Sequence, residues 1–348
     1  MRIERRPRSI PVRELRSALL AALLVLAVAP TAQAQSSAQS SAQSPALSEL
    51  LSGVVRMKAF INPDGRTAPT LGREREGSAI VIDNDGLILT IGYLMVEAHS
   101  AEVVTNDGQD VPANIVGYDH QTGFGLLRAI VPLKVRPLAF GKSAALKERD
   151  PVVVASFGGP DNAEAAMVVA KREFAGNWEY LLDQAIFTAP PHPAWSGAAL
   201  LDHEGKLVGV GSLIVGDATG KGTGVQGNMF VPTDLLPPIL ADLLANGRAA
   251  GVGRPWLGVN TDEMHGHLMV SAVTRDGPAD HAGLKRGDII LGVNGEPVNH
   301  LPDFYRKLYA QGDAGTLIRL DVLKDNEQQH VEVKSINRLD HLRLKSSF

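Results

Sequence analysis

Short apolar runs separated by turn signals dominate the chain from about residue 47 to residue 238. The runs are rich in Val, Ile and Leu, and Asx-Gly or a similar pair lies between several of them. Asx-Gly flanked by apolar runs predicts a β-hairpin. We therefore expect hairpins over residues 78–90, 102–116 and 197–213. Several hairpins in one region of this length predict an all-β barrel or sandwich.

Two stretches have helical periodicity instead. Apolar positions over 233–246 have the spacing of one helix, and Gly247 predicts its end. A second and stronger helical candidate, over 301–311, lies among short strands near the end of the chain. The Gly- and Ala-rich segment at 248–253, directly after the first helix, has no periodicity, which indicates a linker. The predicted organisation is a first domain at 47–247, a linker at 248–253, a compact second domain at 254–338 and a mixed-charge tail at 339–348.

The N-terminal 34 residues have the pattern of a targeting segment. Arginines crowd the first 16 positions, an apolar run covers 18–29, and Ala32-Gln33-Ala34 is a small-residue cleavage site. A retained membrane anchor is the alternative, but the run is shorter than the roughly 20 residues that a span needs. We predict a signal peptide at 1–34 and a polar, low-complexity tether at 35–46. The product is then a periplasmic or secreted protein.

Composition narrows the function classes further. The chain has 348 residues and no cysteine, which excludes disulfides, thiolate nucleophiles and cysteine-based zinc sites. It has 34 Lys+Arg against 38 Asp+Glu, a formal net charge of −4, and loss of the arginine-rich leader makes it more acidic. Neither nucleic acid nor, after signal cleavage, an anionic membrane is therefore an expected partner. No motif indicates a cofactor or a metal.

Three segments of the first domain resemble the trypsin-like proteases of the HtrA/DegP family. Residues 76–90, EGSAIVIDNDGLILT, are similar to the family's run before its catalytic histidine. Residues 117–127, GYDHQTGFGLL, are similar to its aspartate motif, and residues 194–201, AWSGAALL, to GNSGGPLL. The three occur in the family's order and at its spacings. The resemblance implies a mainly β fold, in which a trypsin-like double β-barrel precedes a second domain.

The resemblance preserves one of the three catalytic positions. Ser196 matches the nucleophile, but Tyr93 occupies the position of the histidine and Gly123 that of the aspartate. A serine hydroxyl needs a neighbouring base that is itself oriented by a third group. Tyrosine is a poor base near neutral pH, and glycine has no side chain to orient one. The oxyanion loop also differs, since Ala194 and bulky Trp195 precede Ser196. We therefore predict a pseudoprotease.

Other residues offer weaker chemistry. His192 is four residues before Ser196 and could serve as a displaced base only in a rearranged loop; otherwise it is an exposed loop histidine. His99, on an expected short helix after Tyr93, is out of reach. Ser196 itself could persist as a small turn residue. His265-Gly266-His267 lacks carboxylate or thiol companions, so a solvated turn is favoured over a metal site.

The second domain resembles the PDZ domains appended to these proteases. Residues 254–259, RPWLGV, match the family's entry to the carboxylate-binding loop, and residues 276–298 match its turn, helix and strand pattern almost completely. PDZ domains bind peptides as an added strand, and backbone N–H groups capture the terminal carboxylate. The resemblance implies a groove between the edge at 257–259 and the helix at 301–309. Its predicted residues are Trp256, Leu257, Gly258, Val259, Leu268, Phe304 and Leu308.

These observations lead to one principal hypothesis and three alternatives. The principal one is an exported HtrA/DegP-like protein, inactive as a protease, that binds peptides or unfolded protein C-termini through its PDZ domain in protein quality control or as an adaptor. The first alternative is an active serine endopeptidase in which Ser196 uses a non-standard base. The second is a regulatory subunit that joins active HtrA-type proteases, since that family assembles as trimers; a homo-trimer is also implied. The third is a PDZ domain used only for packing against the first domain.

Overall fold

The computed structural model describes residues 46–344. The predicted signal peptide and all but the last residue of the predicted tether lie outside the described residues. No helix within 46–344 is long and apolar enough to cross a membrane.

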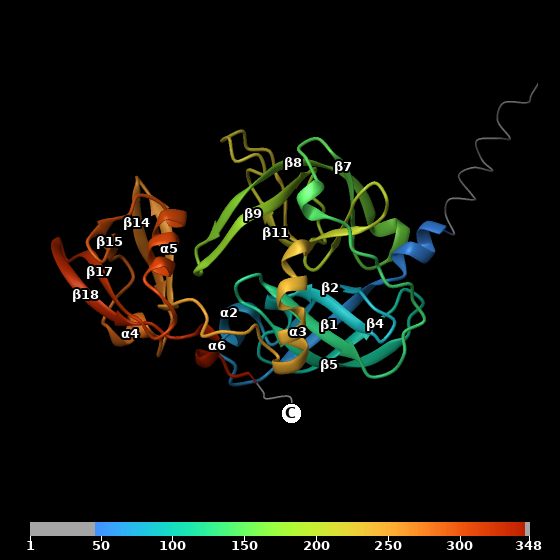
Figure 1. Cartoon of the computed structure of the whole chain (residues 1–348), viewed down its shortest axis with the longest axis horizontal. Coiled ribbons are helices and arrows are strands. Elements are labelled where there is room, and N and C mark those ends of the chain that lie inside the picture. Colours follow the sequence, from blue (N-terminus) through green and yellow to red (C-terminus); the bar gives the residue numbers. More distant parts are fainter. Residues whose placement is uncertain (1–45, 345–348) are drawn as a thin grey trace, which may run out of the picture. The chain divides into compact units, whose positions relative to one another are not determined.

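Two closed six-stranded antiparallel barrels follow one another along the first part of the chain, as the blue-to-green and green-to-yellow strands of Figure 1. The strand order is β1-β2-β3-β6-β5-β4 in the first and β10-β11-β12-β9-β8-β7 in the second. The double β-barrel implied by the sequence resemblance is thereby confirmed. The first barrel comprises β1 (Val54–Ile61), β2 (Glu74–Val81), β3 (Leu87–Ile91), β4 (Ala98–Val104), β5 (Asp110–Tyr118) and β6 (Phe124–Ala129). The second comprises β7 (Pro151–Ala155), β8 (Ala163–Gly176), β9 (Tyr180–Ala189), β10 (Ala199–Leu201), β11 (Leu207–Val215) and β12 (Gly227–Pro232).

The three predicted hairpins are present. The pairs β2–β3, β4–β5 and β10–β11 are each antiparallel neighbours, joined by the turns that the Asx-Gly and Glu-Gly signals mark. Gly86 and Gly205 have φ values of 75° and 75°, a region that glycine enters without the steric cost of a Cβ atom. The turn chemistry in the sequence thus fixes where these strands reverse.

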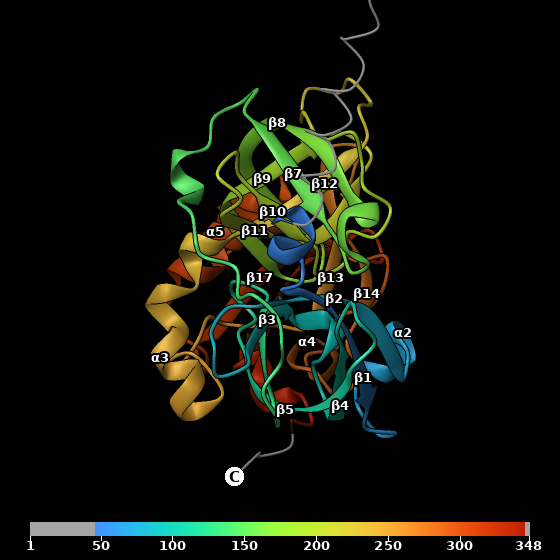
Figure 2. The same cartoon turned by 90° about the vertical axis from the view of Figure 1, so that its right-hand side faces the viewer.

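The helix predicted over 233–246 consists of two pieces. A 3₁₀ turn, η4 (Thr233–Leu235), precedes the α-helix α3 (Pro237–Asn246). Pro237 occupies the first helical turn, where its missing N–H costs no hydrogen bond. Gly247 ends α3 with a φ of 70°, and its carbonyl oxygen accepts a bond from the Tyr118 N–H of β5 at 3.1 Å. Figure 2 shows α3 on the outer side of the strands.

The C-terminal part of the chain is an α+β sheet domain, as the PDZ resemblance implies. Its strand order is β13-β14-β15-β17-β18, with β16 paired to β15, so β13 lies at one edge. Phe304, Tyr305 and Leu308 of α5 are fully buried in its core. The elements are β13 (Val259–Met264), β14 (His267–Val273), α4 (Pro278–His281), β15 (Ile289–Val293), β16 (Glu296–Pro297), α5 (Leu301–Ala310), β17 (Leu317–Lys324), β18 (Glu327–Lys334) and α6 (Arg338–His341). Further short helices are α2 (Ala68–Leu71), η1 (Gly92–Leu94), η2 (Ser143–Ala145) and η3 (Gly159–Asn162).

Candidate functional site

Ser196 lies in the turn that leads into β10, where both barrels hold it. Its carbonyl oxygen accepts a hydrogen bond from the Ser78 N–H of β2 at 2.8 Å, and the next residue, Gly197, donates to the Gly211 carbonyl of β11 at 2.9 Å. Gly197 has a φ of 74°, and a Cβ atom there would overlap the Ser78 carbonyl oxygen. Only glycine fits this position without a shift of β2. The sequence motif therefore forms a rigid turn between the two barrels.

Tyr93 takes the place of a base beside Ser196. Its Oη lies 2.8 Å from Ser196 Oγ and donates to the Ser212 carbonyl oxygen at 2.9 Å. Because the phenol has one proton and the carbonyl can only accept, the Ser196 hydroxyl donates to the phenol oxygen. Burial raises the pKa of Tyr93 above its ordinary value. A neutral phenol is a very weak base, so this contact anchors Ser196 rather than activating it.

The aspartate position is closed as well. Gly123 has a φ of 81°, and its carbonyl oxygen accepts from the Gly92 N–H at 2.7 Å. A Cβ atom at position 123 would lie 3.1 Å from Tyr180 Oη, which donates to the Thr122 carbonyl oxygen at 2.6 Å. The nearby carboxylate of Asp119 accepts from the Thr122 N–H and Oγ1 at 2.7 and 2.8 Å. The local carboxylate thus stabilises its own turn.

His192 is buried and has a structural role, contrary to the exposed loop histidine expected from the sequence. It is 3% exposed, because Asn228 of β12 bonds both its N–H and its carbonyl oxygen, at 2.6 and 3.2 Å. Its Nδ1 accepts the N–H of Ala194 at 3.1 Å. Ala194 is the oxyanion-loop residue two before Ser196, so this N–H already has an internal acceptor. Oxyanion stabilisation needs donors free to point at the developing charge.

Among residues 46–344, Tyr93 supplies the one side-chain hydrogen bond made by Ser196 Oγ. His99 is exposed on β4, not on the short helix expected from the sequence. His265 and His267 flank the β13–β14 turn and are exposed. Three or more metal-ligating side chains do not gather anywhere in the described part of the chain. Within the described residues, neither an imidazole nor a carboxylate hydrogen-bonds to Ser196 Oγ.

The predicted carboxylate-binding loop holds a carboxylate from the same chain. The backbone N–H groups of Leu257, Gly258 and Val259 donate to the side-chain oxygens of Glu179 at 2.8, 2.6 and 2.8 Å. Glu179 lies in the turn between β8 and β9, is 3% exposed and has a φ of 60°. Burial raises its pKa to about 7, although the three N–H donors favour the ionised form. The loop that captures peptide C-termini in PDZ domains is therefore occupied.

The same turn lies between β13 and α5, where a peptide strand is expected. The Asn177 carbonyl oxygen accepts from the Thr261 N–H on the edge strand β13 at 3.0 Å, and its side chain donates to Asp262 at 2.8 Å. From α5, Tyr305 Oη donates to the Gly176 carbonyl oxygen at 2.8 Å and accepts from the Glu179 N–H at 3.0 Å. Backbone pairing to one edge strand is the way PDZ ligands bind.

Apolar contacts extend from the turn into the C-terminal core. Leu181 of β9 is 7% exposed and belongs to the same apolar cluster as the predicted groove residues Leu257, Leu268, Phe304 and Leu308. Trp256, also predicted for the groove, points elsewhere. Its backbone N–H donates to the Ile336 carbonyl oxygen, and its ring lies 4.9 Å from that of His341 in α6.

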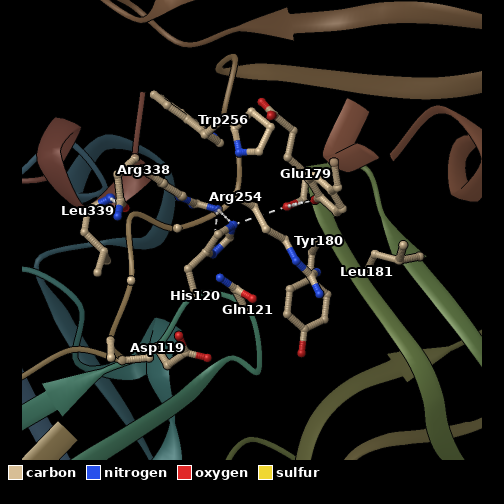
Figure 3. Close-up of a pocket in the computed structure, with 17 residues that line it drawn as sticks. Asp119, His120, Gln121, Glu179, Tyr180, Leu181, Arg254, Trp256, Arg338 and Leu339 are labelled. Atoms are coloured by element: carbon tan, nitrogen blue, oxygen red, sulfur yellow. Dashed lines mark hydrogen bonds between the residues drawn. The ribbon is translucent and has the colours of Figure 1, made fainter. Parts of the chain in front are cut away.

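Figure 3 shows the pocket beside this turn, where His120 and Arg338 lie near Glu179. His120 Nε2 contacts the Glu179 carbonyl oxygen at 3.2 Å, and Arg338 Nη1 lies 3.0 Å from the same ring. Burial and the neighbouring guanidinium hold the pKa of His120 well below its usual value. The cavity at this place is small, about 50 Å³. The titratable groups that face Glu179 are His120, Tyr305, Tyr309, Arg254 and Arg338.

Ser196 lies beside Tyr93, and the carboxylate loop lies beside α5, as the sequence predicts, whereas the parts played by Glu179 and Tyr305 were not predicted. The signal for Glu179 is weak, because Asn177-Trp178-Glu179 has the composition of an ordinary turn between two apolar runs. Tyr305 follows the predicted groove residue Phe304 on the same helix. Its role depends on a hydroxyl that contacts a turn distant in sequence.

The comparisons agree with this architecture. Residues 77–210 match the model of a trypsin-like peptidase domain, and residues 255–335 match that of a PDZ domain. Among curated proteins, the Escherichia coli periplasmic pH-dependent serine endoprotease DegQ is 28% identical over 79% of this chain and 62% of its own length. A DegP-like periplasmic serine endoprotease of Ectopseudomonas mendocina is 30% identical over 75% of this chain and 57% of its own length. The chain thus spans less than two thirds of these relatives.

Solved structures share the fold at lower identity. The HtrA-type protease AlgW with a decapeptide superposes with a TM-score of 0.50 and 22% identity, covering 84% of this chain and 98% of that one. An AlgW variant with a tripeptide gives a TM-score of 0.51 and 21% identity, covering 84% and 96%.

Proposed function

Because this chain is an HtrA/DegP-like protein, with a trypsin-like peptidase domain followed by a PDZ domain, we propose that it binds peptides or unfolded chains in the periplasm without cleaving them. Names of the curated relatives support the compartment, since each is a periplasmic endoprotease. Activity is the property in which this chain departs from them.

The contact between Ser196 Oγ and the Tyr93 phenol carries the proposal of inactivity. A general base must accept the serine proton as the nucleophile attacks. Here the phenol already donates its own proton to Ser212, and burial keeps it neutral. The Ala194 N–H, bonded to His192, removes one oxyanion donor as well. Base and oxyanion site are impaired together.

The geometry of the loop at 257–259 supports peptide binding. Three consecutive N–H groups converge on one carboxylate beside the edge strand β13, which is the arrangement that captures a peptide C-terminus. AlgW, one of the proteins that share this fold, has been solved with a decapeptide and, as a variant, with a tripeptide. A C-terminal peptide segment of an unfolded protein is the ligand class that fits.

Two assays on the purified chain test the inactivity. Fluorescent casein reports endopeptidase turnover, and a fluorophosphonate probe reports an activated serine at Ser196. The matched control is Ser196→Ala, and a DegP-like relative provides the positive signal. We expect neither casein cleavage nor Ser196-dependent labelling. Cleavage or labelling that disappears in Ser196→Ala overturns the proposal and establishes a serine endopeptidase with a non-standard base.

A further inference from the structure

We propose that the β8–β9 turn, residues 176–179, is the resident ligand of the PDZ groove, and that an external peptide binds only after this turn has left. The inference rests on the proposed function, because it concerns access to the same peptide groove. It assigns to Glu179 the role of an internal substitute for a peptide C-terminus.

The turn satisfies each part of peptide recognition. The Glu179 carboxylate takes all three N–H donors of the loop at 257–259. Asn177 pairs its backbone with Thr261 on the free edge of β13. Leu181 adds an apolar side chain to the cluster that contains Phe304 and Leu308. An incoming peptide needs these same groups, so the two ligands exclude each other.

The helical wall of the groove is adapted to the turn. Tyr305 is fully buried, yet its hydroxyl finds one acceptor and one donor on the turn, the Gly176 carbonyl and the Glu179 N–H. Tyr309 Oη donates to the Glu179 carbonyl oxygen at 3.2 Å. A buried phenol hydroxyl without partners is costly. The side chains of α5 thus offer hydroxyl groups to the polar backbone of this turn, in addition to an apolar surface.

Exposed ion pairs at the edge of the hairpin add less to its docking than the buried contacts of Glu179 do. Arg306 of α5 forms ion pairs with Glu173 of β8 and, at 3.5 Å, with Asp183 of β9. These side chains are solvent-accessible, and exposed ion pairs contribute little. Glu173 therefore provides a matched control for Glu179: the same residue type, in the same hairpin, against the same domain, but outside the carboxylate loop.

The test compares the full chain with Glu179→Gln and Glu173→Gln. The amide introduced by Glu179→Gln keeps the size of the side chain but has one acceptor oxygen and no charge, so at least one N–H of the loop loses its partner. Hydrogen–deuterium exchange of the amides at 257–261 reports whether the turn is docked. We expect strong protection in the wild type and in Glu173→Gln, and faster exchange in Glu179→Gln. Tyr305→Phe, which removes the hydroxyl from the other wall, should raise exchange at the same amides.

Peptide binding is measured separately by fluorescence anisotropy. The probe is a labelled decapeptide that ends in Leu with a free carboxylate, and its C-terminally amidated form is the negative control. Only molecules with an open groove bind the peptide, so the apparent Kd is the intrinsic Kd divided by the open fraction. We therefore expect at least about tenfold tighter binding by Glu179→Gln than by the wild type or Glu173→Gln.

The outcomes separate the two proposals. Equal peptide affinity in wild type and Glu179→Gln overturns the resident-ligand inference and leaves peptide binding intact. Fast exchange at 257–261 in the wild type also overturns it. Protection that is lost in Glu179→Gln, with no peptide bound by any variant, supports the docked turn and instead overturns the proposed peptide-binding function.

Discussion

Replacing Tyr93 by histidine puts an imidazole at the position from which a trypsin-like base acts, yet we predict that the variant does not become a protease. Tyr93 Oη spans the space between Ser196 Oγ and the Ser212 carbonyl oxygen, at 2.8 and 2.9 Å. An imidazole is shorter than a phenol and cannot keep both contacts. Position 123 offers no carboxylate to orient the ring, because it is glycine.

The expected deficit follows from the missing groups. A triad without its aspartate loses about 10⁴-fold in turnover. An oxyanion site without one donor, as when the Ala194 N–H is held by His192 at 3.1 Å, loses about 10²–10³-fold. Such effects do not add. We therefore take the larger alone, and expect Tyr93→His to remain at least about 10⁴-fold below an intact enzyme, about 5 kcal/mol in barrier height.

Adding Gly123→Asp does not repair the site. The φ of 81° at this position disfavours any residue with a Cβ atom, and that atom would lie 3.1 Å from Tyr180 Oη. Tyr180 cannot move aside without breaking its 2.6 Å hydrogen bond to the Thr122 carbonyl oxygen. The double variant should be less stable than Tyr93→His and equally inactive.

The assay is fluorescent casein turnover, with a DegP-like relative measured in parallel and Tyr93→His/Ser196→Ala as the background. The result that refutes the reasoning is specific. It is casein turnover by Tyr93→His within about a hundredfold of the relative, lost when Ser196 is also replaced. The occupied oxyanion donor and the empty aspartate position would then not limit this site.

Three further predictions concern stability, measured by urea unfolding. Gly197→Ala should cost about 3 kcal/mol because its Cβ overlaps Ser78, whereas Gly222→Ala, at a φ of 70° with no atom within 4 Å, should cost about 1 kcal/mol; equal costs would contradict the packing argument. Tyr93→Phe should lose about 1–3 kcal/mol with the two hydrogen bonds of its hydroxyl, and a neutral effect would show that these bonds do not matter. Burial raises the pKa of Glu179 from 4.5 to about 7, so the ionised form is disfavoured in the folded state. The free energy of unfolding, measured relative to Glu179→Gln, should therefore fall by about 3 kcal/mol as the pH rises from 4.5 to 7, and stay level above that. A difference that is independent of pH, or that grows with pH, would exclude this.

The parts of the structure that follow local chemistry could be predicted from the sequence. The Asx-Gly turns place the strand reversals, because a positive φ at glycine is needed where the chain turns back. The replacement of the family's histidine and aspartate could be predicted too, since Tyr93 follows the motif at 76–90 by three residues and Gly123 lies within the motif at 117–127. In both cases, one short segment contains the whole signal.

The roles of His192 and Glu179 could not be predicted in this way. Four residues before Ser196 and between two prolines, His192 has the local sequence of an exposed loop, and Asn228 on β12 buries it. Glu179 lies in a turn with ordinary turn residues, and the N–H groups that bind it are 78 to 80 residues away in sequence. The local sequence around His192 gives no sign of its contact with Asn228, and the local sequence around Glu179 gives no sign of its contact with the loop at 257–259. Such contacts are decided by the packing of separate elements.

The serine loop and the PDZ groove share one physical feature, which bears on how this fold is stabilised without a bound ligand. A buried N–H group that has no acceptor while the ligand is absent destabilises the folded state by about 1–3 kcal/mol. Here Ala194 donates to His192, and the loop at 257–259 donates to Glu179. Internal acceptors therefore stabilise the protein at the expense of ligand binding. At the serine loop the acceptor is His192, a buried side chain of the same loop, and the loop has no separate segment whose departure would free the donor. In the groove, the acceptor is on a hairpin that a carboxylate peptide can displace, so function should persist there and not at Ser196.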